Sequence, residues 1–401
     1  MRRSPSGRKT IRLRKGGDFK QNGPRPELDL PASLGDAAAR KLTVRLDWYP
    51  KIGALVGSGN GTVTAVRDTG ELEARHLAFV DLDAVYFELV RHKEERGWHN
   101  LTLSREKMVE LLENPDWYEL TIPSEDLEFA PGSLGRRVRI WQEIATALLK
   151  AYCKKYYDTR RAEFESAFLQ YEELTDDDPN FLKEYRFGVE ASKEEYVRKL
   201  RDLKATIESG QLESLTLWGA LDIFSFDQHL YRPLVHLRNK DVAVKPVALN
   251  EGEQQFVRDL KRYHEAHPEV FESRELYLLR NLSRGKGIGF FEAGNFYPDF
   301  ILWLLDGDRQ YVTFIDPKGI TRLRGVEDPK IEFKNTIKEI EDRLAAPDVT
   351  LHSFIISNTP YDEIEYWGMS KKDLEYRHVL FQKEDEDTYV ETMLERILDH
   401  G

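Results

Sequence analysis

The chain has 401 residues, of which 40% are hydrophobic and 32% charged, and its formal net charge at pH 7 is −12. This length is typical of two or three domains. The acidic balance argues against nucleic-acid binding through overall charge, although a local basic patch is enough for phosphate contacts. No apolar run reaches the roughly 20 residues that cross a bilayer. The single cysteine, Cys153, excludes an intramolecular disulfide and a cysteine-based zinc site. We therefore expect a cytoplasmic protein without membrane contact.

The first 130 residues predict a flexible arm followed by a small module. Residues 1–40 are expected to form a flexible basic arm, which either contacts nucleic acid or has no partner, because residues 1–20 hold eight basic residues against Asp18. Residues 41–130 alternate short apolar runs with turn signals, and they predict a small mixed α+β module. Its expected elements are strands at 42–48 and 62–66 and a helix at 104–112. The glycine-rich residues 57–62 lack the lysine and the spacing of a phosphate loop, so we expect a turn there.

Residues 131–215 predict a helical region. Few helix breakers occur in residues 136–210, and Ile140, Ile144 and Leu148 recur at helical spacing. This pattern favours two or three amphipathic helices, interrupted near residues 176–179. Residues 216–248 are expected to connect this region to a C-terminal domain.

The C-terminal domain, residues 249–401, carries the sharpest pattern. We expect a helix over 251–267, capped by Asn250, and then strands over 275–282, 296–305 and 311–318. Asp328-Pro329 predicts the start of a second helix that runs to about residue 344, and a strand follows at 350–356. The predicted class is α/β, and the predicted order is αβββαβ.

The register of the predicted hairpin brings two carboxylates together. If Leu305 pairs with Gln310 across the loop at 306–309, Asp299 lies opposite Asp316, and strand alternation places Lys318 on the same face as Asp316. The flanking residues are apolar on both faces, as in central strands. Two adjacent carboxylates in such surroundings repel each other and lose solvation unless a cation compensates. The hairpin therefore predicts a metal site.

A third carboxylate comes from the predicted first helix. Glu253 falls in the middle of the apolar stripe of that helix, whereas Glu251 points to the opposite side. We expect Glu253 to join Asp299 and Asp316 around Mg²⁺, for which Mn²⁺ is an expected substitute, because hard cations prefer oxygen ligands. Each feature alone has an ordinary explanation. Residues 316–319 also suit a β-turn, Pro298 suits the start of a strand, and Glu253 alone could pair with a lysine. The combination favours the metal site.

Pro298-Asp299 and Asp316-Pro317-Lys318 resemble the two motifs of the PD-(D/E)xK nuclease superfamily. Residues 296–301 and 314–319 are most similar to the nuclease domain at the C-terminus of type III restriction subunits and related defence helicases. The resemblance covers about residues 229–357 and is faint upstream. Two departures are an aspartate where glutamate is commoner and a proline at the variable position, both of which the family pattern permits. The resemblance implies a restriction-endonuclease-like αβββαβ core, preceded by the helical region and the small module.

The resemblance also implies an activity. It implies metal-dependent endonuclease cleavage of DNA in a restriction or phage-defence system. Glu253, Asp299 and Asp316 would hold one or two Mg²⁺ ions, and Lys318 would orient or deprotonate water and stabilise charge on the phosphate. We expect Lys318 to stay protonated beside the carboxylates until a metal binds. The residues expected to contact nucleic-acid phosphates are Arg280, Arg284, Lys286 and Lys334.

The sequence lacks a motor motif, and this bears on the partners that the proposed nuclease would need. No nucleotide-binding motor motif is present, so a helicase or ATPase would belong to another chain, to another defence-system subunit, or to sequence missing here. Arg284 and Lys286 are equally well explained as ordinary loop charges. Two other functions remain open: a non-catalytic nucleic-acid-binding or assembly subunit that retains the nuclease fold, and an RNA-processing nuclease.

Overall fold

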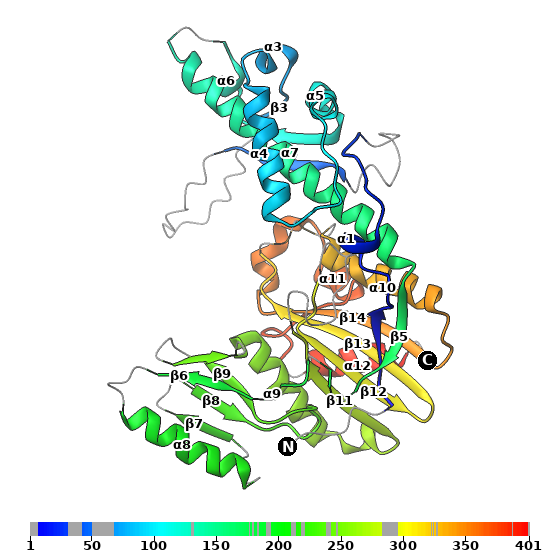
Figure 1. The fold of residues 1–401 in the computed structure, drawn as a ribbon. Helices are drawn as coiled ribbons and strands as arrows, with labels where there is room; N and C mark the ends of the chain where they lie inside the picture. Colours follow the sequence, from blue (N-terminus) through cyan, green and yellow to red (C-terminus); the bar gives the residue numbers. More distant parts are fainter. Residues whose placement is uncertain are drawn as a thin grey trace. The chain divides into compact units, whose positions relative to one another are not determined.

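The computed structural model shows a mixed α/β protein with two compact units (Figure 1). The small unit is Lys15–Phe168, and the large unit combines Met1–Arg14 with Leu169–Gly401. The structure describes the whole chain except residues 1–6, 31–41, 50–67, 130–131, 176, 179, 183, 190–193, 210–213, 218–220, 238–241, 246–247, 283–295, 322, 324, 326–327, 387 and 400–401. The expected strand at 62–66 and the glycine-rich turn at 57–62 lie outside the described residues.

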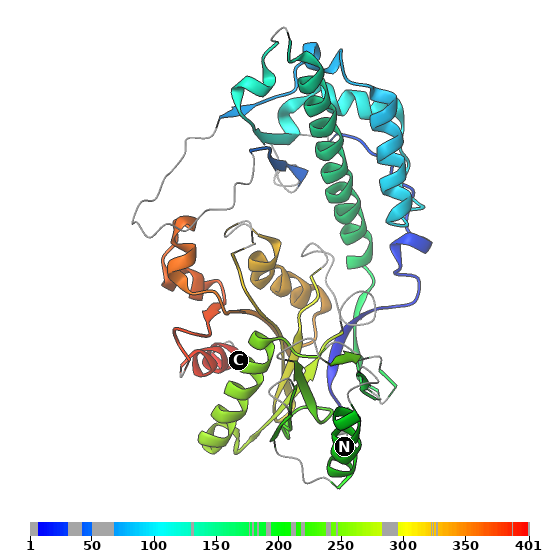
Figure 2. The same cartoon turned by 90° about the vertical axis from the view of Figure 1, so that its left-hand side faces the viewer.

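The small unit packs short elements around one long helix. Helix α7 (Leu134–Ser166) runs unbroken beside α4 (Leu82–Glu95), as Figure 2 shows. A three-stranded sheet has the order β2-β4-β3, with β2 (Val44–Asp47) parallel to β4 (Tyr118–Thr121) and β3 (Thr69–Gly70) antiparallel to it. The remaining elements are α1 (Phe19–Asn22), α3 (Ala74–Leu77), α5 (Arg105–Glu113), η1 (Pro115–Trp117) and α6 (Ser124–Leu127).

Helix α7 holds the small unit together through one buried face. Its buried side chains recur every three or four residues, from Trp141 to Tyr157, which is the pattern of an amphipathic helix. Buried tyrosines on this face are hydrogen-bonded, as such groups require. The Tyr152 hydroxyl donates to the Asp29 carbonyl at 2.7 Å, and the Tyr157 hydroxyl donates to Asn100 Oδ1 at 2.8 Å. The expected mixed α+β character and the expected helix near 104–112 are both found.

The large unit contains the element order expected from the sequence. Helix α9 (Glu251–Ala266) is followed by η2 (Pro268–Phe271) and by three antiparallel strands, β11 (Arg274–Arg280), β12 (Phe300–Asp306) and β13 (Arg309–Lys318). Helix α10 (Pro329–Leu344) then crosses to β14 (Val349–Ser357), which pairs parallel to β13. The chain continues through η3 (Tyr361–Trp367), α11 (Lys371–Tyr376), β15 (Val379–Phe381) and α12 (Tyr389–Leu398). The sheet order is β11-β12-β13-β14-β15.

The register of the hairpin β12–β13 is the predicted one. Leu305 pairs with Gln310, and at the far end of the hairpin Phe300 pairs with Ile315. The loop is shorter than expected, because Asp306 also pairs with Arg309 and only two residues remain between the strands. The first of them, Gly307, has a φ of +58°, a conformation that suits a tight hairpin turn and favours glycine.

Helices cover both faces of this sheet. Phe256 of α9 contacts Phe300 at a ring-centroid distance of 5.4 Å, whereas Phe333 of α10 contacts Phe314 at 6.5 Å. Phe300 pairs with Ile315, so Phe300 and Phe314 point to opposite faces. Helix α9, together with α12, therefore covers one face, and α10 covers the other. The strands are buried almost throughout, in agreement with their apolar sequence.

The basic N-terminal segment differs from the expected flexible arm. Residues Lys9–Leu13 form β1, which pairs antiparallel with β5 (Leu169–Glu173). The Trp303 indole donates to the Lys9 carbonyl at 2.8 Å, and the buried Arg8 guanidinium lies 3.4 Å from the centroid of the Tyr277 ring. The basic side chains of this part are thus used in packing and ion pairs within the large unit, which composition alone does not reveal.

The expected helical region and connector also contain strands. After α7, helix α8 (Glu194–Glu208) is the second helix of the region, but β5 and β6 (Arg186–Gly188) lie between them. The expected connector forms an antiparallel sheet of β7 (Ser214–Leu217), β8 (Leu221–Phe224) and β9 (Leu234–Leu237), and β10 (Ala243–Lys245) pairs with β6. Hydrophobic side chains of α8 pack against this sheet.

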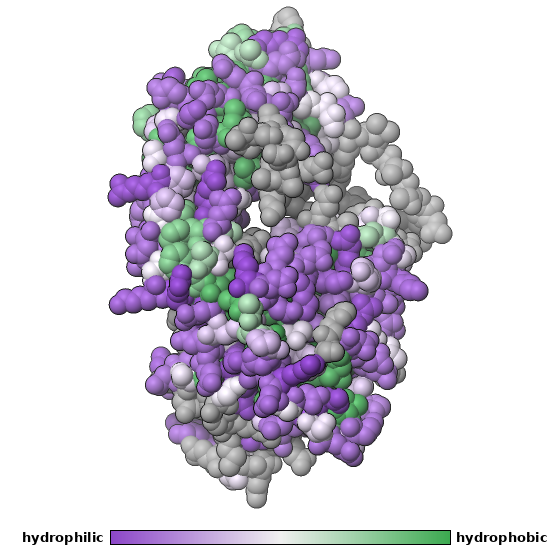
Figure 3. All heavy atoms as spheres, turned by 90° about the vertical axis from the view of Figure 1, so that its right-hand side faces the viewer, coloured by the Kyte–Doolittle hydropathy of each residue, from purple (hydrophilic) through white to green (hydrophobic). Residues whose placement is uncertain are grey.

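None of the helices in the described part of the chain has the length and apolar character needed to span a membrane. On the face shown in Figure 3, hydrophilic side chains of the described residues predominate, and hydrophobic ones form separate small patches.

The turn at Gly307 generates a prediction about stability. We expect Gly307→Ala to lower the free energy of unfolding by about 1 kcal/mol, because a Cβ atom disfavours positive φ even where space is open. Gly307→Asn should cost less, since asparagine tolerates this conformation. Chemical denaturation of the three proteins measures the difference, and equal stability of all three would contradict the assigned turn.

Candidate functional site

Two aspartates meet where β12 begins and β13 ends. Asp299 directly precedes β12, and continuing the register of the hairpin places it opposite Asp316. Asp316 is buried, with 5% of its surface exposed, and Asp299 is half-buried. Burial, followed by the neighbouring Asp316 and a hydrogen bond between the two side chains, raises the pKa of Asp299 to about 9. At neutral pH, Asp299 therefore keeps its proton.

The backbone before Asp299 is held by Asn281, which follows β11. The Asn281 backbone N–H donates to the Asp299 carbonyl at 2.7 Å, and its side-chain amide donates to the Pro298 carbonyl at 2.8 Å. Asn281 is buried. These two bonds extend the sheet beyond the last pair of β11 and β12 and fix the direction of Asp299. An asparagine directly after a strand is too common a signal to identify this role from the sequence.

Lys318 lies on the same side of β13 as Asp316. Its Nζ forms an ion pair with Asp316 Oδ2 and lies 5.3 Å from the centroid of the Phe296 ring. Burial lowers the pKa of Lys318, and nearby Lys330 adds to this effect, while Asp316 opposes it. The direction is opposite to the one expected from the carboxylates alone, because their proximity does not outweigh desolvation and a second cation.

Glu253 lies in the first turn of α9 and points inward, as its helical phase predicts. It is 5% exposed, whereas Glu251 is exposed. Its side chain accepts from the backbone N–H of Asn250 at 3.0 Å, while Asn250 Oδ1 accepts from the Glu253 backbone N–H, so the two form a capping box. Burial raises the pKa of Glu253, Arg280 opposes this effect, and Asp316 contributes to it.

Arg280 contacts Glu253 directly. Its Nη2 lies 2.9 Å from Glu253 Oε2 and donates to the Ala248 carbonyl at 3.2 Å, and 16% of its side chain is exposed. In this structure Arg280 forms an inward ion pair with Glu253, and its expected phosphate contact stays a prediction. Alternation along a strand cannot reveal this role, because the partner lies on a separate helix.

His229 is a further residue that the sequence did not single out. It is fully buried, and burial lowers its pKa to about 3, so its ring is neutral at physiological pH. Nδ1 lies 2.7 Å from the Tyr231 carbonyl, and Nε2 accepts from the Arg280 backbone N–H at 3.0 Å. His229 thus fixes the end of β11 from which the Arg280 side chain reaches Glu253. A single histidine in a segment expected to be a connector carries no signal for this contact.

The first turn of α9 is held close to the ends of β13 and β14. Asn358, just after β14, donates its backbone N–H to the Lys318 carbonyl at 3.1 Å. A Cβ atom on Gly252 would lie 3.0 Å from Asn358 Nδ2, and one on Gly319 would lie 3.2 Å from Asn358 Oδ1. Glycine at both positions lets the three segments approach. On the other side, Gln254 Nε2 donates to Asp222 of β8 at 3.0 Å.

The other expected phosphate contacts have different outcomes. Arg284 and Lys286 lie outside the described residues. Lys334 lies on α10, where its Nζ donates to the Tyr376 carbonyl at 2.6 Å and lies 4.0 Å from the centroid of the Tyr376 ring. Lys330, one turn earlier on α10, lies near Lys318, because its Nζ is 5.6 Å from the centroid of the Phe296 ring that Lys318 also contacts. The helix start at Asp328-Pro329 is the sequence signal that could have indicated Lys330.

The carboxyl groups of the candidate site meet only part of what a divalent cation requires. Within the described residues, no three His, Cys, Asp or Glu side chains are arranged as a ready metal site. Glu253 is directed to Arg280 and Asn250, and Asp316 forms an ion pair with Lys318. Asp299, however, forms no ion pair with any lysine or arginine of the described chain. Mg²⁺ often uses only one or two carboxylates, with water and substrate phosphate completing its shell. Asp299 and Asp316 satisfy that minimum.

Comparisons of the chain with protein-family models, with curated proteins and with solved structures gave no match. What the site can do is therefore inferred from its geometry alone. Two adjacent carboxyl groups and a lysine lie at one end of a buried hairpin, and an arginine holds a third carboxylate nearby.

Proposed function

We propose that the chain is a metal-dependent endonuclease that hydrolyses phosphodiester bonds in DNA. The observation that carries this proposal is the close placement of Asp299, Asp316 and Lys318 at the end of the β12–β13 hairpin. A half-buried carboxyl group beside a second one is costly for a purely structural site. Its presence is explained if a cation and an anionic substrate compensate it.

The order of elements supports a restriction-endonuclease-like core. The series α9-β11-β12-β13-α10-β14 combines an antiparallel hairpin with a parallel crossover to β14. Of the two motifs, Pro298-Asp299 directly precedes β12, and Asp316-Pro317-Lys318 forms the end of β13. We propose membership of the PD-(D/E)xK superfamily on this basis, and a role in restriction or phage defence with a helicase or ATPase partner.

Asp299 and Asp316 would hold Mg²⁺, for which Mn²⁺ is an expected substitute. The bound ion would supply an activated water and neutralise charge on the phosphate during attack. Lys318, with a lowered pKa, is suited to orient that water or accept its proton and to contact a phosphate oxygen. Glu253 would add a carboxylate from α9, in competition with its ion pair to Arg280.

A non-catalytic subunit is the second candidate, and one observation favours it. Glu253 and Asp316 are each already paired with a cation of the chain. A nuclease fold retained only for nucleic-acid binding or assembly would tolerate such internal pairing. Asp299 distinguishes the two candidate functions. It forms no ion pair with any lysine or arginine of the described residues, so a negative charge on Asp299 is not compensated by pairing within them.

Cleavage assays test the catalytic assignment. We expect the wild type to cut plasmid or single-stranded DNA with Mg²⁺ and not with EDTA. Asp316→Asn and Lys318→Ala should each lower the rate by about a thousandfold, the usual scale for losing an acid–base or electrostatic contribution. Asp308→Asn, in the exposed loop of the same hairpin, is the matched control and should keep full activity.

Three results would overturn this assignment. They are equal cleavage by the wild type and both variants, activity that persists in EDTA, and the absence of cleavage of both DNA and RNA under every metal condition. Preferential cleavage of RNA would keep the site but change the substrate.

Stability measurements test the carboxylate pair without relying on activity. The pKa of Asp299 is about 9 in the folded protein and about 4 in the unfolded chain. Between these values only the unfolded chain loses the proton, so this group makes the metal-free protein less stable as pH rises from about 4 to about 9. Asp299→Asn should remove that pH-dependent destabilisation and raise the melting temperature at pH 8.

Added metal should narrow the difference in stability between the two proteins. At a Mg²⁺ concentration 100 times the Kd, the wild type should gain about 2.7 kcal/mol, whereas Asp299→Asn should gain much less. Thermal unfolding with EDTA, with Mg²⁺ and with Ca²⁺ measures both effects. An Asp299→Asn protein that is less stable than the wild type in EDTA and responds equally to Mg²⁺ would show that Asp299 is only structural.

A further inference from the structure

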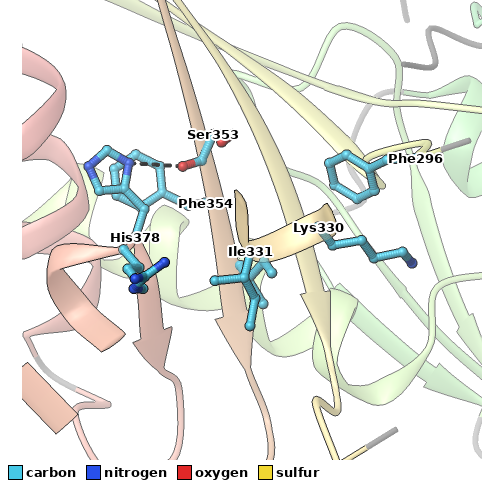
Figure 4. A pocket seen from close by; sticks show the side chains of 8 residues that line it. Phe296, Lys330, Ile331, Ser353, Phe354 and His378 are labelled. Carbon is cyan, nitrogen blue, oxygen red and sulfur yellow. Dashed lines mark hydrogen bonds between the residues drawn. The ribbon is translucent and has the colours of Figure 1, made fainter. Parts of the chain in front are cut away.

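A shallow hollow opens beside the candidate site, between the first turn of α10 and the turn that joins α11 to β15. It is a surface depression and contains no enclosed space large enough for a water molecule. Its inner wall is made of buried side chains, among them Phe296, Ile331 and Phe354, and Lys330 and Arg377 provide its cationic groups. Figure 4 shows the extended Lys330 side chain near the Phe296 ring and His378 next to Phe354.

The hollow adjoins the candidate catalytic lysine. The Phe296 ring lies 5.3 Å from Lys318 Nζ and 5.6 Å from Lys330 Nζ, so the two ammonium groups share one aromatic wall. They are close enough that Lys330 affects the pKa of Lys318. A strand whose phosphate contacts Lys318 can therefore present a neighbouring phosphate to Lys330.

Four cationic side chains of the described residues line the hollow or lie near it, and one of them, Arg377, forms an ion pair with a described carboxylate. Lys330, Lys334, Arg377 and Arg396 come from α10, from the turn after α11 and from α12. Burial, followed by the nearby charges of Arg396 and Arg377, lowers the pKa of Lys334, and Glu332 opposes this effect. Glu332 pairs with Arg377 at 2.5 Å, and Arg396 donates to the Glu375 carbonyl. An anionic ligand would relieve the remaining repulsion, as a phosphate does.

An exposed aromatic ring lies next to these cations. Tyr376, at the end of α11, is 71% exposed, although it is a large side chain. Lys334 Nζ lies 4.0 Å from its ring centroid, so the lysine covers one side of the ring. Exposed aromatic rings beside basic groups are typical platforms for unpaired bases, because every base has a flat face to stack.

The turn that carries Tyr376 and Arg377 is held firmly. His378 adopts a φ of +61°, a conformation in which glycine is the usual residue after a helix. Its ring stacks on Phe354 at a centroid distance of 4.3 Å and an angle of 6°, and Nδ1 lies 3.0 Å from the Ser353 carbonyl. A side chain that locks an unfavourable backbone conformation keeps its neighbours in place.

We propose that this surface binds an unpaired nucleic-acid strand, with a phosphate between Lys330 and Arg377 and a base stacked on Tyr376. The proposal rests on the proposed nuclease function and adds a substrate class to it. The strand that enters the site of Asp316 and Lys318 is single-stranded, or locally unpaired, on the side of α11.

Binding experiments without cleavage test this proposal. Fluorescence anisotropy of the full chain in EDTA compares a labelled 15-mer of thymidines with a blunt hairpin duplex. Tyr376→Ala should weaken binding of the single strand about tenfold, the low end for removal of one stacked base, and should leave binding of the duplex almost unchanged. Tyr376→Phe should bind like the wild type. Phe87→Ala, at another exposed aromatic residue in the small unit, is the matched control.

The cations give a second, independent readout. The double variant Lys330→Ala/Arg377→Ala should weaken single-strand binding and reduce the slope of log Kd against log salt by about 0.7 for each phosphate that is no longer neutralised. Unchanged single-strand binding by Tyr376→Ala, equal weakening on both nucleic acids, or no binding by the wild type would overturn the proposal. Cleavage by the wild type in a separate Mg²⁺ assay would leave the nuclease function standing even then, so the two failures are distinguishable.

Discussion

The close approach of two carboxyl groups, Asp299 and Asp316, is the constraint on which the candidate site depends. The hairpin β12–β13 forces it, because the register that buries the apolar residues of both strands also sets these aspartates opposite each other. The hairpin cannot slip by one residue without turning its side chains to the other face. Repulsion between the two carboxyl groups is reduced because Asp299 is protonated and because Asp316 forms an ion pair with Lys318.

A second layer of contacts holds these groups in position. Asn281 directs Asp299, His229 fixes the strand end from which Arg280 reaches Glu253, and Gly252 lets α9 approach the ends of the strands. These contacts join α9, the sheet and the segment before β9 into one polar network inside an apolar core. Buried networks of this kind are sensitive to the removal of any one member, because the remaining partner is left desolvated.

Local patterns were sufficient for much of the fold and for the centre of the site. The helical phase selected Glu253 over Glu251, and the hairpin register brought Asp299 to Asp316, because both depend only on fixed periodicities of helix and strand. Long-range pairings were not accessible in this way. The pairing of β1 with β5 and the sheet formed by β7, β8 and β9 involve short strands whose partners lack a distinguishing local signal. The sequence pattern of the strand that contains Arg280 could not show whether this arginine pairs with a phosphate or with a carboxylate.

The sequence by itself determined the α/β class, the order of the elements from α9 to β14, and the three acidic residues and the lysine of the candidate site, since each follows from spacing along the chain. Only the tertiary structure decided how the charges are distributed among them. It paired Glu253 with Arg280, brought Lys330 of α10 beside Lys318, and desolvated Lys318 so that its pKa falls. These outcomes depend on desolvation and on distances between separate elements, and both arise only when the helices pack onto the sheet.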